Sequence, residues 1–154
     1  MTDATAYRSM TATTLQTAAT VVAGTFLLVG VLGFIPGVTT DYDSMTFAGH
    51  ESNAQLLGIF QVSILHNIVH LLFGIAGLVL ATSWAGARAY LIAGGAIYMV
   101  LLIYGLAVDH GSSANFVPVN GADNWLHLVL GVGMLALGLA LGRTPGAADR
   151  PGAL

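Results

Sequence analysis

Four long apolar runs, separated by short polar stretches, make up most of the chain. They lie at about residues 15–35, 56–81, 87–108 and 125–142. Each has about the 20 residues that a helix needs to cross the hydrocarbon core of a bilayer. Because apolar residues follow one another without alternation, the runs favour helices over strands. The pattern predicts an all-α, four-helix transmembrane bundle over residues 15–142, with an N-terminal segment (1–14) before it and a disordered tail (143–154) after it.

The composition agrees with a membrane location. The chain has 154 residues, of which 56% are hydrophobic and 7% are charged. Soluble proteins carry about 25% charged residues, and a soluble fold of this length has no room to bury so much apolar surface. Cysteine and lysine are absent, which excludes disulfides, thiolate ligands and Schiff-base lysines. The few arginines form no basic patch, so the expected partner is the lipid bilayer and not nucleic acid.

The positions of the arginines predict how the bundle is oriented. Arg8 precedes the first run, Arg88 separates the second from the third, and Arg143 and Arg150 follow the fourth. In a four-span chain all of them lie on one side, which the positive-inside rule makes cytoplasmic. Acidic residues fall on the other side, at Asp41, Asp43, Glu51, Asp109 and Asp123. We therefore expect a multi-pass protein of the cell inner (plasma) membrane with both termini in the cytoplasm.

A polar motif occurs twice within the apolar runs. The pattern Asn-x-x-His-Leu-x-x-Gly begins at Asn67 in the second run and at Asn124 in the fourth, so His70 aligns with His127. The first and third runs match only weakly. Since both copies have the same orientation in the membrane, we predict a parallel tandem repeat of a two-helix unit.

Each predicted helix gathers its small and polar residues on one face. The second helix places His66, Asn67 and His70 within one arc, and the fourth helix does the same with Asn124 and His127. The first helix groups Thr13, Thr17, Thr20 and Gly24. Small residues permit close helix packing, and polar groups that face hydrocarbon are costly, so we expect these faces to point inward. They predict a polar cluster near the extracytoplasmic face, formed by the histidines with Ser63, Asn67, Asn124 and Asp109.

One interpretation of this cluster is structural. Hydrogen bonds between His70 and Asn124, or between His127 and Asn67, would hold the helices in register at roughly 0.6–2 kcal/mol each. Asn124 would also cap the start of the fourth helix. In this interpretation the cluster contains no catalytic residue.

A second interpretation is a metal or haem site. His66 and His70 are four residues apart, so their rings share one helix face and can share one ion, with His127 as a third ligand. Three imidazoles with an open position suit zinc or copper. Two histidines on facing helices would also suit the axial positions of haem.

A third interpretation is a subunit linked to proton transfer or to quinones. Histidines near the extracytoplasmic face would exchange protons with that side of the membrane. No acidic residue lies at mid-membrane to continue a proton relay. A transporter usually has such a residue or a broken helix, and the sequence shows neither.

The paired signatures, Asn67-Ile-Val-His70-Leu and Asn124-Trp-Leu-His127-Leu, resemble those of a bacterial family of small four-span integral membrane proteins classed only as a domain of unknown function. The resemblance covers roughly residues 15–142 and implies the fold but no reaction. A weaker resemblance is to four-helix membrane proteins that accompany quinone or thiol oxidoreductases, and the absence of cysteine argues against a thiol role.

From these features we expect an integral membrane protein that is not an enzyme and acts as a structural or accessory subunit. Its partners would be the bilayer and either other membrane subunits or a second copy of the chain. The alternatives are a protein that binds a metal ion or haem through His66, His70 and His127, and a proton- or quinone-linked subunit.

Overall fold

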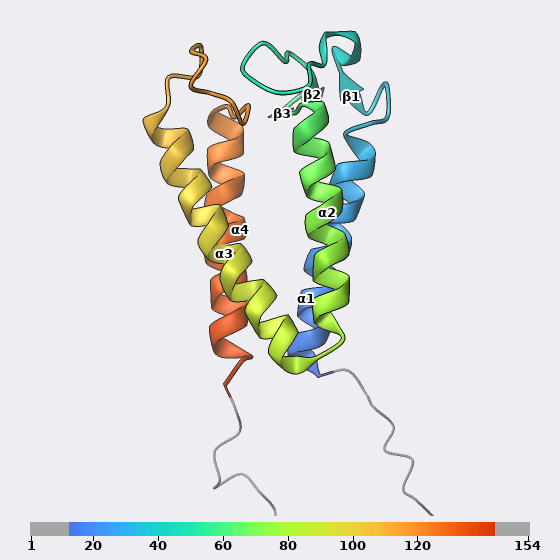
Figure 1. The fold of residues 1–154 in the computed structure, drawn as a ribbon, viewed down its shortest axis with the longest axis vertical. Helices are drawn as coiled ribbons and strands as arrows, with labels where there is room; N and C mark the ends of the chain where they lie inside the picture. The colour runs from blue at the N-terminus through green and yellow to red at the C-terminus, as the bar shows by residue number, and fades with distance from the viewer. Residues whose placement is uncertain (1–12, 144–154) are drawn as a thin grey trace, which may run out of the picture.

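The computed structural model describes residues 13–143, which form two helical hairpins joined by a short turn (Figure 1). The helices of this part are α1 (Thr14–Leu32), α2 (Ile64–Ala81), α3 (Trp84–Ala107) and α4 (Gly121–Ala140). Helix α1 packs along α2 and α3 packs along α4, while fewer contacts join the two hairpins. All four helices are long and apolar enough to cross a membrane. The prediction of an all-α, four-helix bundle in a multi-pass membrane protein is confirmed.

Capping side chains determine where the helices begin. Ser63 accepts a hydrogen bond from the N–H of His66 at the start of α2, and Ser83 does the same for Gly86 at the start of α3. Asn120 caps α4 by accepting from the N–H groups of Ala122 and Asp123. These bonds satisfy backbone donors that have no partner within the helix. The prediction that Asn124 caps the fourth helix is wrong, because the capping residue lies one turn earlier.

A small antiparallel sheet covers one end of the bundle and corrects the predicted start of the second helix. Its strands are β1 (Thr39–Thr40), β2 (Gln55–Leu56) and β3 (Phe60–Gln61), in the order β1-β2-β3. Helix α2 begins at Ile64 and not at residue 56. The turn between β2 and β3 holds Leu57 and Gly58 at positive φ, which breaks the apolar run before the helix can start. We call this end, with its strands and the loop between α3 and α4, the loop end, and the opposite end the turn end.

Lipid-facing positions account for the high apolar content. Val21, Val100, Leu106, Trp125 and Val129 are each more than 60% exposed and lie on the outer faces of their helices. A surface of this kind is stable in acyl chains and unstable in water.

The inward face of α1 differs from the prediction. It consists of Leu15, Ala19, Ala23, Phe26 and Gly30, whereas the predicted face of Thr13, Thr17, Thr20 and Gly24 is exposed. The hydroxyl of Thr20 donates to the carbonyl of Gln16 at 2.9 Å. A threonine that satisfies its hydroxyl within its own helix can face lipid at little cost. The predicted N-terminal segment (1–14) and tail (143–154) lie almost wholly outside the described residues.

The two hairpins repeat the same contacts. The side chain of Asn67 lies against Gly33 near the end of α1, and that of Asn124 lies against Gly105 near the end of α3. The ring of Phe26 packs on His70 with 5.5 Å between centroids, and that of Tyr98 packs on His127 with 5.4 Å. The corresponding N-caps are Ser63 and Asn120. These pairs support the predicted tandem repeat.

The repeat also aligns α1 with α3, which the sequence related only weakly. Phe26 corresponds to Tyr98 and Gly33 to Gly105, because each makes the equivalent contact with α2 or α4. Phe26 and Tyr98 stack on each other with 5.5 Å between ring centroids. The two hairpins are related by a pseudo-twofold axis. Because equivalent residues can touch only beside such an axis, the axis passes between these two rings.

Candidate functional site

Three cavities lie between the hairpins, and their walls meet at His70. The first, of about 230 Å³, is bounded by α2, α3 and the loop before α4. The second, of about 150 Å³, lies beneath β2 and β3. The third, of about 140 Å³, lies between α1 and α4. His70 lines all three, and His66, Tyr98 and His127 line the first two.

The hydrogen bond of His70 determines which ring nitrogen faces the cavities as an acceptor. The Nδ1–H of His70 donates to the carbonyl of His66 at 3.0 Å, since a carbonyl oxygen can only accept. In the neutral ring, Nε2 then carries a free lone pair. The His66 and His70 rings stack with 4.4 Å between centroids and 15° between planes. Helix periodicity explains this stacking, because residues four apart lie one above the other.

His127 approaches the same space from the other hairpin. Its side chain is buried in α4, and its Nδ1 has no hydrogen-bond partner among the described residues. A buried polar atom without a partner costs roughly 1–3 kcal/mol. The atoms packed around this nitrogen enclose it, so it is not open to the cavities.

Asp123 is a fourth polar residue in the second cavity, and the predicted site did not include it. Its Oδ2 accepts from the backbone N–H of Asn120 at 2.9 Å and from that of Gln61 at 3.2 Å. Gln61 belongs to β3, so this carboxylate ties the sheet of the first hairpin to α4 of the second. A sequence signal existed, because Asp123 follows the Asn120 cap by three residues, as in a capping box.

The predicted polar cluster is divided between two environments. Ser63 caps α2 and lines the first cavity. Asn67 and Asn124 lie inside their own hairpins, where Nδ2 of Asn124 donates to the carbonyl of Gly105 at 3.1 Å. The predicted histidine–asparagine hydrogen bonds are not formed. Asp109 is exposed in the loop after α3, where Oδ1 accepts from a neighbouring backbone N–H, and it is not part of the cluster.

Comparison with known families identifies the protein family of the chain. A family model described as a domain of unknown function (DUF4383) matches residues 16–140. The chain belongs to the DUF4383 family. The match takes in nearly all of the four helices and confirms the resemblance drawn from the paired signatures. Searches of curated proteins and of solved structures found no match to the chain. The function of this DUF4383 protein has to be argued from its site.

The described residues do not present a ready metal site in the DUF4383 chain. Over residues 13–143, no three histidine, cysteine, aspartate or glutamate side chains are placed to hold one ion. A structural or catalytic zinc site needs at least three protein ligands at about 2 Å. The geometry gives no support to metal binding by His66, His70 and His127, and the metal and haem interpretations stay predictions.

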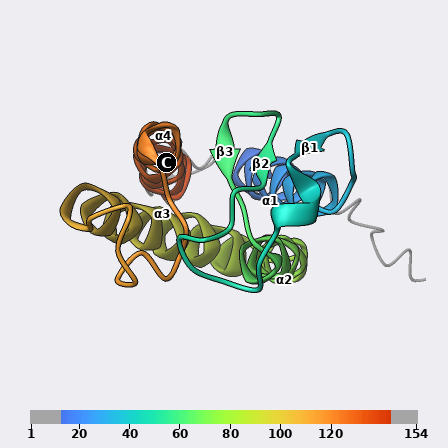
Figure 2. The same cartoon turned by 90° about the horizontal axis from the view of Figure 1, so that it is seen from above.

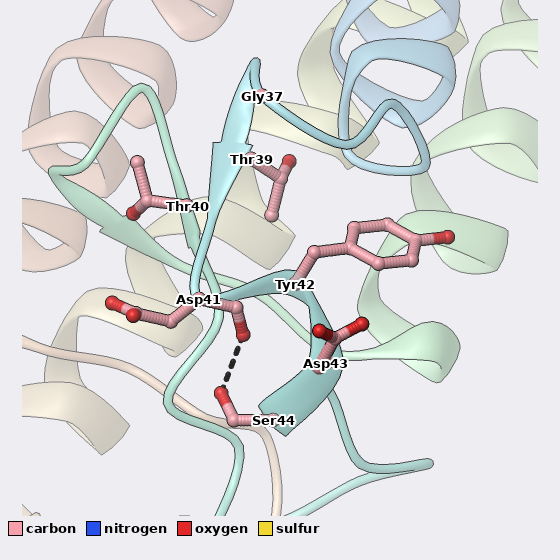
Figure 3. A pocket seen from close by; sticks show the side chains of 7 residues that line it. All are labelled: Gly37, Thr39, Thr40, Asp41, Tyr42, Asp43 and Ser44. Atoms are coloured by element: carbon pink, nitrogen blue, oxygen red, sulfur yellow. Dashed lines mark hydrogen bonds between the residues drawn. The ribbon is translucent and has the colours of Figure 1, made fainter.

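A larger hollow at the loop end lies apart from the histidines (Figure 3). Its volume is about 470 Å³, and Gly37 and residues 39–44 line it. Asp41 and Asp43 contribute carboxylates, and the hydroxyl of Ser44 donates to the carbonyl of Asp41 at 2.6 Å. No residue of the four α-helices of the DUF4383 bundle lines this hollow, and Tyr42–Ser44 form a short 3-10 helix in its wall, so it offers only an acidic surface beside the bundle.

Proposed function

We propose that this protein binds a membrane-dissolved amphipathic small molecule in the cavities between its hairpins. The observation that carries the proposal is the position of His70, an imidazole within a membrane-spanning helix that lines three adjoining, mostly apolar cavities. Apolar walls with a few convergent polar groups are typical of small-molecule sites. His70 has protein partners at Nδ1 and on its ring faces, but its Nε2 has no hydrogen-bond partner among the described residues.

The positions of the cavities support entry of the ligand from the bilayer. The third cavity is bounded by Val22 and Leu126, on α1 and α4, and the first by Val69 and Ile97, on α2 and α3. Seen from above, the two hairpins stand side by side, with α1 and α2 in one and α3 and α4 in the other (Figure 2). Both cavities therefore lie along the seam between the hairpins, where an acyl-like body can enter.

The polar atoms of the site support a ligand with a hydrogen-bonding head. Nε2 of His70 is an acceptor without a hydrogen-bond partner among the described residues. Water is scarce at this depth, so such atoms gain more from a ligand than they would at an aqueous surface. The ligand would place its head beside the histidines and its apolar body between the helices.

A structural or accessory role without a ligand is the second candidate. It is supported by Asn67 and Asn124, whose side chains serve contacts within the hairpins and do not line the histidine cavities. Both candidates place the chain in the inner membrane with the turn end in the cytoplasm. That orientation is supported by Arg88 and Arg143 at the turn end, under the positive-inside rule.

The test compares ligand retention in three forms of the full-length protein. Wild type, His70→Leu and His110→Leu are purified with native lipid, and bound molecules are extracted and quantified by mass spectrometry. His110 is the control because it lies in the exposed loop outside the cavities. We expect a near-stoichiometric species in wild type and His110→Leu that falls severalfold in His70→Leu at unchanged thermal stability. Equal retention in all three, or no retained species, would contradict the proposal.

A further inference from the structure

The two hairpins differ at one position that lines the second cavity. His66 follows the Ser63 cap by three residues, and Asp123 follows the Asn120 cap by three. Asp123 therefore occupies in the second hairpin the place that His66 occupies in the first. Both side chains line the same cavity, and that of Asp123 is 2% exposed. This replacement puts one acidic group in a cavity that both hairpins line.

Two features of its surroundings stabilise the ionised form of Asp123, while burial of the side chain opposes it. Oδ2 accepts two backbone hydrogen bonds, from Asn120 and from Gln61. Asp123 also lies in the first turn of α4, where the helix dipole stabilises negative charge. Hydrogen bonds of this kind favour a carboxylate over a carboxylic acid.

The other oxygen of this carboxylate is open to the cavity. Within residues 13–143 no donor is hydrogen-bonded to Oδ1. Oδ1 is also not among the enclosed polar atoms without partners, which include Nδ1 of His127. Asp123 lines the 150 Å³ cavity, and we infer that the free space beside Oδ1 is part of this cavity.

No arginine or lysine of the described chain is near enough to balance this charge, and the histidine that acts on it electrostatically is His110, in the loop after α3. Arg88 and Arg143 lie at the turn end, and lysine is absent from the sequence. The loop end carries further carboxylates at Asp41, Asp43, Glu51 and Asp109. A region that carries charge of one sign attracts ligands of the opposite sign and raises their local concentration.

The neutral groups that face Asp123 also suit a cation. From α2 and α4 these are His66, His70 and His127, and His70 directs its N–H to a carbonyl and not to the carboxylate. Tyr98 of α3 and Phe60 of β3 place aromatic rings in the same cavity. Aromatic faces attract cations, most strongly where water is excluded.

We propose that the ligand is a cationic amphiphile, with a protonated amine that donates to Oδ1 of Asp123 and an apolar body between the hairpins. This inference rests on the proposed function and adds the charge of the head. An ammonium group supplies both the donor and the charge that the carboxylate lacks. A neutral hydroxyl head would satisfy the hydrogen bond but leave the charge unbalanced.

The test uses two probes that share an alkyl chain, dodecylamine and dodecanol. Radiolabelled forms of each are bound at equilibrium to the full-length protein in phosphatidylcholine nanodiscs, with empty nanodiscs as the background. The proteins are wild type, Asp123→Asn and Asp43→Asn. Asn keeps the size of the side chain and an oxygen that accepts from the backbone. Asp43 is the matched control, because its substitution makes the same change in net charge at an exposed loop-end position outside the cavity (Figure 3).

We expect wild type and Asp43→Asn to bind dodecylamine about tenfold or more tightly than dodecanol. In Asp123→Asn this preference is lost while the protein keeps its thermal stability. Equal binding of the two probes by wild type, or a preference that survives in Asp123→Asn, overturns the cationic ligand and leaves the proposed site standing. If neither probe binds saturably to the wild-type protein, the proposed function itself is overturned. If Asp123→Asn unfolds, Asp123→Ser takes its place; loss of the amine preference in the folded variant supports the inference, and survival of that preference overturns it.

Discussion

Substituting Gly105 with alanine tests how the paired asparagines hold the hairpins together. A Cβ at Gly105 would overlap Oδ1 of Asn124, so the amide has to move. That movement breaks the 3.1 Å hydrogen bond from Nδ2 of Asn124 to the carbonyl of Gly105. Overpacking costs about 1–3 kcal/mol, the lost bond about 0.5–1.5 kcal/mol, and alanine returns up to about 1 kcal/mol in helix propensity. We expect the free energy of unfolding to fall by about 2 kcal/mol.

Gly133→Ala is the matched control for this measurement. Gly133 lies in α4 and has no atom within 4 Å of a built Cβ, so alanine there adds helix propensity without a clash. Reversible unfolding in mixed micelles, followed by circular dichroism, should separate the two variants by about 2–3 kcal/mol. The double variant Gly105→Ala/Asn124→Ala should lose less free energy of unfolding than the two single variants lose together, because the overlap between the new Cβ and the amide is gone. Equal stability of Gly105→Ala and Gly133→Ala would refute the reasoning.

Two further predictions concern the cap of α4 and the orientation of the bundle. Asn120→Ala removes the helix cap and the 2.8 Å bond from its Nδ2 to the carbonyl of Ile59, so we expect a loss of about 1–2 kcal/mol in the same unfolding assay; an unchanged value would mean that backbone contacts alone begin the helix. Because the chain has no cysteine, single cysteines introduced by Ser113→Cys at the loop end and by Ala85→Cys at the turn end report the topology in intact cells. A membrane-impermeant maleimide should label the Ser113→Cys variant and not the Ala85→Cys variant. The reverse labelling would show that the orientation is inverted.

The helices were predictable because their physical requirement is simple. A span needs about 20 apolar residues in a row, and four such runs are visible in the sequence. The start of α2 was not predictable from hydropathy, since Leu56, Phe60 and Ile64 form one apolar stretch although only Ile64 is helical. The two-residue strands before it depend on the turn at Leu57 and Gly58 and on pairing with Thr39–Thr40, which is distant in sequence.

The candidate site was predictable in part. Helical periodicity placed His66 beside His70, and burial of the polar face placed His127 opposite them. Asp123 was counted only as an acidic residue of the extracytoplasmic side, because its contact with Gln61 of β3 joins elements whose contact no local pattern reveals. The threonine face of α1 misled for a different reason: a hydroxyl can bond within its own helix, so a polar face does not by itself identify the inside of a membrane bundle.

The repeat separates the residues that build the bundle from those that give the cavity its chemistry. Like pairs, such as Asn67 with Asn124, make the same contact in both hairpins and leave the cavity walls to other residues. The unlike pair, His66 with Asp123, lies one turn closer to the loop end than the paired histidines and faces a shared space. If the two hairpins carried identical groups at this position, the head group of a ligand would meet the same chemistry on both sides of the cavity. The single carboxylate removes that equality, so a ligand between the hairpins has one preferred orientation, with its charged end toward β3 and α4.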